Sequence, residues 1–174
     1  MLDRVREAIS STLAPWLPDA FVLDLFAGSG SLGLEALSRG ARVARMIERD
    51  REAYALLKRN VASLGMDERT EAVCGDALDP AAWGGTPADI VFLDPPYPWL
   101  KERKGRASIF AGIQGLLDRV LASDGVLVFH APRNAVVASE FGQGVELAGR
   151  TYGSNAIWYV GHASAEEDDE VKDD

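Results

Sequence analysis

Cysteine and histidine are scarce in this 174-residue sequence, which contains one cysteine, Cys74, and two histidines, His130 and His162. A single cysteine excludes an internal disulfide and a cysteine-based metal cluster. The two histidines lie far apart in the chain, and we expect each to be an ordinary satisfied or exposed side chain. The composition therefore predicts a protein without a bound metal.

Long hydrophobic runs are also missing. No apolar stretch is long enough to span a bilayer, and the opening residues MLDRVREAIS lack the apolar core of a signal peptide. Hydrophobic residues still make up 47% of the chain, as in ordinary globular proteins. We expect a soluble, cytoplasmic protein without membrane contact, folded as one domain over residues 1–163. Nothing resembles a dimer seam, so we expect a monomer.

Positive charge is in deficit, since 18 basic residues face 27 acidic ones and the net charge is −9. The terminal stretch AEEDDEVKDD carries seven acids and one lysine, hence −6 of that total. Residues 164–174 are therefore predicted to be a disordered acidic tail. The body is close to neutral, and its basic stretch KERKGR (101–106) remains a candidate for contact with a polyanion, because the local field decides such binding.

Apolar strands alternate with helical patterns along the body. Strands are expected at 20–26, 42–48, 70–75, 89–94 and 126–131, and two more within 145–161; helices are expected at 3–17, 30–40, 50–65, 107–125 and 133–141. This order predicts a single-domain, Rossmann-like α/β fold with helices on both faces of the sheet. The sheet should have seven strands, mostly parallel, with an antiparallel final strand.

Four acids stand out because each lies at or near the carboxyl end of a different predicted strand: Asp24, Glu48, Asp76 and Asp94. Parallel strands with right-handed crossovers place ligands at that edge of the sheet. One such acid would be unremarkable surface. Four in succession predict a binding site.

The first of these acids precedes the glycine loop DLFAGSGSLG (24–33), in which Gly28, Gly30 and Gly33 have the G-x-G-x-x-G spacing. A dinucleotide would place its pyrophosphate on this turn, where the Asp24 carboxylate opposes the charge. S-adenosylmethionine, which carries a sulfonium and an ammonium, fits acids better. Glu48 suits the ribose hydroxyls of either ligand, so the loop alone leaves both open.

FLDPPY (92–97) is the more specific motif. Pro95 and Pro96 fix φ and remove two backbone donors, which makes a stiff turn between Asp94 and Tyr97. The exocyclic amine of a nucleobase is a poor nucleophile. An Asp94 carboxylate and the Pro95 carbonyl accepting its N–H groups would orient it, and Tyr97 would stack on the base. The motif predicts methylation of an amine on a planar ring.

The chain resembles the bacterial 16S ribosomal RNA guanine-N2 methyltransferases, on the stretches DRVREAI (3–9), LDLFAGSGSLGLEALSRGA (23–41), IERD (47–50), FLDPPY (92–97) and YGSNAIWY (152–159). The resemblance implies S-adenosylmethionine as methyl donor and N2 of a guanine in 16S rRNA, within a small-subunit particle, as acceptor. It implies that Asp94, Pro95 and Tyr97 are catalytic. The implied cofactor-binding residues are Asp24, Phe26, Ala27, Gly28, Gly30, Glu48, Arg49, Asp76, Ala77 and Asp94.

RNA contacts are expected from two groups of basic residues, Arg4 and Arg6 near the N-terminus and Lys101, Arg103, Lys104 and Arg106 after the DPPY motif. Three other functions stay open: an N6-adenine DNA methyltransferase, a small-molecule N-methyltransferase, and a non-catalytic RNA-binding assembly protein on the same fold.

Overall fold

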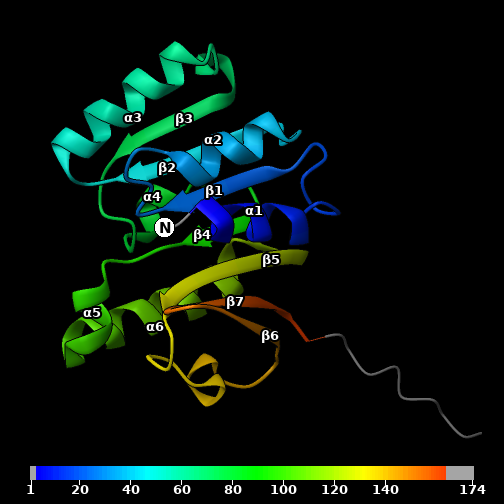
Figure 1. The fold of residues 1–174 in the computed structure, drawn as a ribbon, viewed down its shortest axis with the longest axis vertical. Helices are drawn as coiled ribbons and strands as arrows, with labels where there is room; N and C mark the ends of the chain where they lie inside the picture. Colours follow the sequence, from blue (N-terminus) through cyan, green and yellow to red (C-terminus); the bar gives the residue numbers. More distant parts are fainter. Residues whose placement is uncertain (1–2, 164–174) are drawn as a thin grey trace, which may run out of the picture.

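A seven-stranded sheet forms the centre of the molecule, for which a computed structural model describes residues 3–163. The order across the sheet is β3-β2-β1-β4-β5-β7-β6 (Figure 1). Only β7 runs against its neighbours, so the other strands share one direction. The strands are β1 (Phe21–Leu25), β2 (Val43–Glu48), β3 (Thr70–Cys74), β4 (Ala88–Leu93), β5 (Leu121–Pro132), β6 (Val145–Tyr152) and β7 (Asn155–His162).

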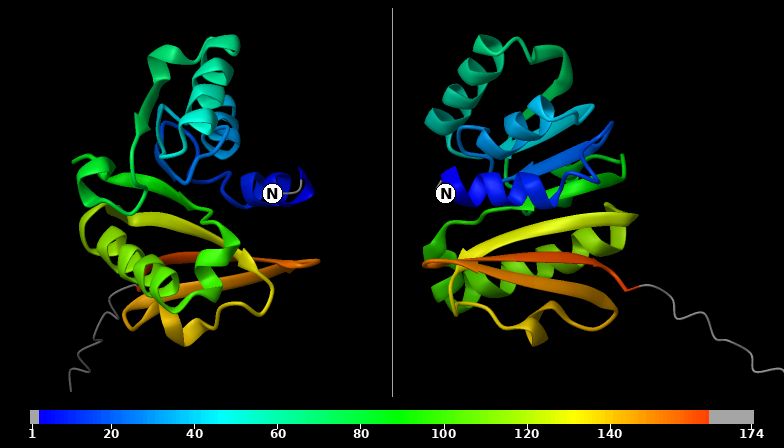
Figure 2. Two further views of the ribbon diagram at one scale, coloured as in Figure 1. Left: turned by 90° about the vertical axis from the view of Figure 1, so that its left-hand side faces the viewer. Right: turned by 45° about the vertical axis from the view of Figure 1, so that its right-hand side comes forward.

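Helices cover both faces of this sheet, as Figure 2 shows from the side. One face carries α1 (Asp3–Thr12), α2 (Ser31–Ser38) and α3 (Arg51–Ser63); the other carries α4 (Pro80–Trp83), α5 (Tyr97–Lys101) and α6 (Arg103–Arg119). Short 3-10 helices occupy Asp67–Arg69 (η1) and Ala138–Phe141 (η2). The predicted Rossmann-like architecture is confirmed.

Two hydrophobic cores result, one on each side of the sheet. Successive residues of a strand point to opposite faces, so Val22 packs under α1 and α2 while Leu23 packs under α6. Both are fully buried. A strand covered on both faces must be apolar at every position, which is why FVLDL reads as one continuous run in which Asp24 is the exception.

Three predicted helix boundaries were wrong. The helix expected over 3–17 ends at Thr12, since Pro15 disfavours a helical conformation in the residue before it. Residues 121–125 begin β5 instead of ending a helix, because Leu121 pairs with Ala88 at the start of β4. The helix expected over 133–141 is reduced to the 3-10 turn η2, since Asn134 adopts a left-handed φ of 63° that an α-helix excludes. The basic stretch 101–106 ends α5 and begins α6.

None of the helices within residues 3–163 combines the length and the apolar character that crossing a membrane requires. The predicted tail, 164–174, lies outside the described residues.

Candidate active site

The carboxyl ends of the parallel strands meet at one edge of the sheet, where the arrowheads of β1, β2, β3 and β5 gather in Figure 1. Asp24 lies in β1 and Glu48 ends β2, while Asp94 follows β4 directly. The charges of Glu48 and Asp94 both act on Asp24. Three of the four acids picked out from the sequence therefore converge.

Two of these carboxylates hold the glycine loop by its backbone. Glu48 Oε2 accepts a hydrogen bond from the Gly28 N–H at 2.8 Å, and Asp24 Oδ2 accepts one from the Gly33 N–H at 2.9 Å. Gly30 has a φ of 82° at the start of α2, in the left-handed region where glycine carries no steric cost. The loop is therefore shaped before any ligand arrives, while direct ligand contact by Asp24 stays a prediction.

The carboxyl group of Asp24 has an unusually high pKa. Burial raises its pKa to about 7, the hydrogen bond from Gly33 opposes this rise, and the negative charges of Asp94 and Glu48 add to it. A cationic ligand at this edge would relieve the clustered charge, whereas a pyrophosphate would increase it. The site therefore suits a sulfonium and ammonium better than a dinucleotide.

Side chains from three elements meet beside the loop. The Phe26 ring lies edge-on to Trp99 of α5 at 5.6 Å, and the Arg49 guanidinium lies 4.8 Å from the Trp99 ring centroid. Phe26 has a φ of 59°, a strained conformation for a bulky residue and one that clusters at functional sites. Thus α5, which begins at Tyr97, is packed directly against the predicted cofactor loop.

The remaining predicted cofactor residues differ in access. Asp76 is exposed, and its Oδ1 accepts a hydrogen bond from the Leu78 N–H at 3.0 Å. Ala77 is buried, and its carbonyl accepts the Trp83 indole N–H at 2.8 Å. Ala77 can therefore offer a ligand little more than its backbone N–H, whereas Asp76 is accessible at the sheet edge. Ala27 is half-buried in the glycine loop.

The DPPY turn presents its two functional side chains outward. The Asp94 side chain is 28% exposed and Tyr97 is 39% exposed, while Pro95 between them is buried. Burial, and then the charge of Asp94, raises the pKa of the Tyr97 phenol, so this hydroxyl keeps its proton. Both side chains are accessible at the turn, and their contacts with a base stay a prediction.

Two polar residues behind the turn escaped sequence reasoning. His130, at the end of β5, is buried and lies with its Nδ1 2.7 Å from Asp94 Oδ1. Asn155, the first residue of β7, is also buried; its Oδ1 lies 2.9 Å from His130 Nε2 and accepts the Tyr97 hydroxyl proton at 2.8 Å. His130 shares the strand-end position of the four acids, which is the signal that could have identified it.

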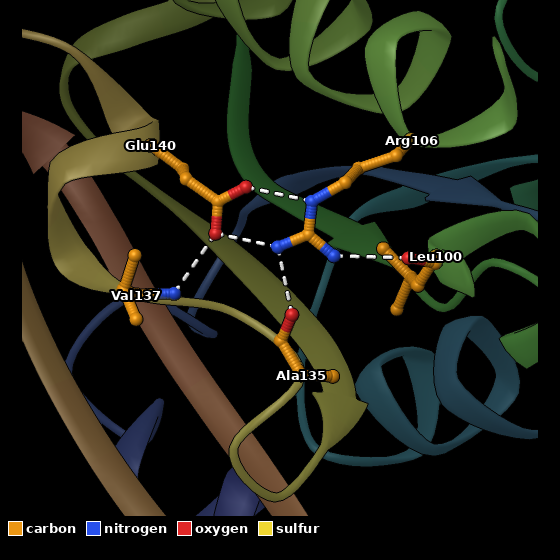
Figure 3. Close-up of polar contacts among 5 residues, drawn as sticks. All are labelled: Leu100, Arg106, Ala135, Val137 and Glu140. Atoms are coloured by element: carbon orange, nitrogen blue, oxygen red, sulfur yellow. Dashed lines mark hydrogen bonds and ion pairs between the residues drawn. The ribbon is translucent and has the colours of Figure 1, made fainter. Parts of the chain in front are cut away.

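The basic residues after the motif divide into two groups. Lys101, Arg103 and Lys104 are exposed, as an RNA contact requires. Arg106 instead binds inside the protein: its guanidinium donates to both carboxylate oxygens of Glu140 and to the carbonyls of Leu100 and Ala135 (Figure 3). These bonds use four of its five N–H donors, so Arg106 ties α6 to α5 and to the loop after β5, which argues against the predicted phosphate contact.

The structure says less about the predicted RNA contacts of the N-terminal arginines, Arg4 and Arg6. Arg6 is half-buried on α1 and already has an interaction partner. Arg4 belongs to α1, but its side chain lies outside the described residues. Their contact with RNA stays a prediction.

A family model, a protein sequence and a solved structure each match most of this chain. The family model described as Conserved hypothetical protein 95 matches residues 1–161. YlbH of Bacillus subtilis (strain 168) is 34% identical over 160 residues, 89% of this chain and 83% of that protein. The solved structure of yhhF from Escherichia coli superposes with a TM-score of 0.79 at 34% identity, covering 94% of this chain and 88% of that one.

A further relative is the Ribosomal RNA small subunit methyltransferase D of Escherichia coli (strain K12), which is 50% identical over 95 residues. That match covers 55% of this chain and spans about half, 48%, of the length of the relative.

Proposed function

We propose a function for this chain, which belongs to the family described as Conserved hypothetical protein 95: it is an S-adenosylmethionine-dependent methyltransferase that modifies the exocyclic N2 of a guanine in 16S rRNA. The observation that carries the proposal is the convergence of a glycine loop, three carboxylates and a DPPY turn at one sheet edge. The relative named Ribosomal RNA small subunit methyltransferase D supports rRNA as the substrate.

The cofactor would lie along the ends of β1 and β2. When bound, S-adenosylmethionine supplies a methyl group carried on a cationic sulfur. Glu48 keeps lone pairs for the ribose hydroxyls after accepting the backbone N–H groups of Gly28 and Asp50. Asp24 would contribute negative charge toward the cationic cofactor, and the exposed Asp76 would be available to the adenine amino group.

The target base would lie against the DPPY turn. Because Asp94 Oδ1 faces His130, its Oδ2 is the oxygen left to accept an N–H of the base amine. The Pro95 carbonyl accepts the second N–H, so that the nitrogen lone pair points toward the methyl group. Tyr97 stacks on the ring from the exposed side. Such positioning replaces a random encounter and lowers the barrier by roughly 7–11 kcal/mol at best.

RNA backbone contacts would come from Lys101, Arg103 and Lys104, which start four residues beyond Tyr97 and are exposed. Their charge is local, so it attracts phosphate even though the chain carries −9 in total.

A transfer assay with methyl-labelled S-adenosylmethionine tests the proposal. Small ribosomal subunits, naked 16S rRNA, duplex DNA and free nucleosides are offered in parallel, with Asp94→Ala as the inactive control. We expect label in the rRNA of wild-type reactions only, with cofactor affinity of the variant nearly unchanged. Label in DNA alone, or in nucleosides alone, identifies one of the other methyltransferase classes, and RNA binding without cofactor binding identifies an assembly protein.

A further inference from the structure

Behind the DPPY turn lies a buried polar cluster formed by His130 of β5 and Asn155 of β7, which join the two functional side chains Asp94 and Tyr97. His130 is 2% exposed and Asn155 is 7% exposed. Strand pairing fixes both, because β5 and β7 are antiparallel neighbours in which Pro132 lies opposite Asn155. The cluster therefore sits on rigid strands rather than on loops.

The hydrogen bonds determine where the protons of His130 lie. Its Nδ1 faces a carboxylate oxygen of Asp94, and a carboxylate can only accept. Nδ1 therefore carries a proton. Its Nε2 faces Asn155 Oδ1 at 2.9 Å and the Tyr97 hydroxyl oxygen at 3.2 Å, and that hydroxyl already donates its proton to Asn155.

The orientation of the Asn155 amide bears on whether His130 Nε2 carries a proton. Its Nδ2 points to the carbonyl of Tyr152 at 3.5 Å, so a turned amide would set two acceptor oxygens against each other. With Oδ1 toward the histidine, Nε2 has acceptors in front of it and must also carry a proton. With the amide in this orientation, every contact of the cluster is satisfied when His130 is an imidazolium.

We propose that His130 is a positively charged positioning residue for Asp94. Resting on the methyltransferase function proposed above, it holds Asp94 Oδ1 so that Oδ2 faces the base amine, and it balances the carboxylates of Asp24, Glu48 and Asp94 at this edge. Through Asn155 it also fixes the hydroxyl of Tyr97, and with it the plane of the stacking ring. One imidazole thus aligns both working residues of the motif.

Nitrogen NMR of the whole chain labelled with ¹⁵N-histidine tests the charge directly and without substrate. The chain has two histidines, so His130→Gln assigns the signals. At about pH 7 we expect both ring nitrogens of His130 to be protonated, and we expect Asp94→Asn, which keeps the shape but removes the charge, to leave one nitrogen bare. An unprotonated ring nitrogen on His130 in the wild-type protein overturns the proposal.

Kinetics test the positioning. His130→Ala should lower kcat about 10- to 100-fold, while KM for RNA and Kd for the cofactor change by less than about twofold, since neither ligand contacts the imidazole. His130→Asn places an amide nitrogen near the position of Nδ1 and should recover part of kcat, whereas His130→Gln, whose amide lies near Nε2, should recover less. The matched control is His162→Gln, at the opposite end of β7, which should behave as wild type.

Equal losses in KM and kcat, or the reverse order of Asn and Gln, would contradict this role. A wild-type protein without methyl transfer would refute the proposed function, and the NMR result would still decide the state of His130.

Discussion

Asp24 is the residue whose chemistry departs furthest from expectation. A carboxylic acid has a pKa of 3.8 when exposed, and burial raises that of Asp24 to about 7. The folded state therefore binds a proton more tightly than the unfolded state. Between these two values stability must fall as pH rises, because the folded protein still binds a proton that the unfolded chain has lost.

This fall in stability with rising pH can be measured by comparing the wild-type protein with Asp24→Asn, whose side chain can still accept the hydrogen bond from Gly33. The free energy of unfolding in urea should shift in favour of the variant between about pH 4 and pH 7, by at most about 4 kcal/mol. At lower pH, where Asp24 is protonated in both states, the difference should be constant. Parallel stability curves across the whole range would show that Asp24 has an ordinary pKa.

Arg106 was expected to contact RNA, but its side chain binds within the protein. In the sequence it belongs to KERKGR, and nothing there separates it from Lys101 or Arg103. In the structure it pairs with Glu140 and caps two carbonyls, and both side chains of the pair are mostly shielded, at 30% and 25% exposed. Two of its partners, Glu140 and Ala135, come from η2 and the loop before it, which no local pattern places beside α6.

Removing this arginine should cost stability rather than RNA affinity. We expect Arg106→Met to lower the free energy of unfolding by about 2–3 kcal/mol, since Glu140 and two carbonyls lose their donors. Arg103→Met, an exposed change on the same helix, should stay within about 0.5 kcal/mol. Urea titrations of both variants measure the difference. A neutral Arg106→Met with weakened RNA binding would restore the phosphate role.

Helix α5 and the start of α6 would connect the proposed chemistry to the RNA. The DPPY turn leads directly into α5, whose Trp99 packs on the glycine loop through Phe26, and α6 begins with the exposed basic residues. Pro98 is tolerated because it falls in the first turn of α5, where backbone N–H groups have no helical partner.

Replacing Lys101, Arg103 and Lys104 together by alanine should weaken binding to 16S rRNA and flatten its salt dependence. Three lost phosphate contacts should reduce the slope of log K against log salt by about 2 to 3. The matched control removes Arg51, Lys58 and Arg59, three exposed basic residues of α3 at the far edge of the sheet (Figure 1). Equal slopes for the two triple variants would show that only net charge matters.

Some features of the strands and helices could be predicted from the sequence, and others could not. Strand positions and the acids at strand ends could be predicted, because burial on both faces demands apolar runs and a ligand edge leaves polar residues just beyond them. The N-cap Asp50 of α3 could also be predicted, and its side chain accepts hydrogen bonds from the N–H groups of Glu52 and Ala53. The strand start at Leu121 depended on pairing with distant Ala88, which the local sequence does not contain.

For the whole molecule, the resemblance to small-subunit rRNA methyltransferases is confirmed at the level of family and fold. The part of the site that could not be predicted is the His130–Asn155 pair. It arises only when β7 returns antiparallel beside β5, bringing residues 25 positions apart into contact. In the sequence, the strand-end position of His130 was a signal for that residue alone, whereas nothing marked Asn155 or its pairing with His130.

The two proposed ligand sites would lie on one continuous surface. The glycine loop follows β1, the DPPY turn follows β4, and the two strands are adjacent and parallel. Methyl donor and target base would thus meet at the centre of the sheet edge, with the basic end of α5 beside them.

Mapping N2-methylguanosine in 16S rRNA by mass spectrometry, in cells with and without this protein, decides whether the chain methylates guanine N2. One guanine should lose its N2-methyl group when the protein is absent, regain it with the wild-type chain and stay unmodified with Asp94→Ala. An unchanged 16S methylation pattern, or restoration by the Asp94→Ala variant, would contradict the proposed function.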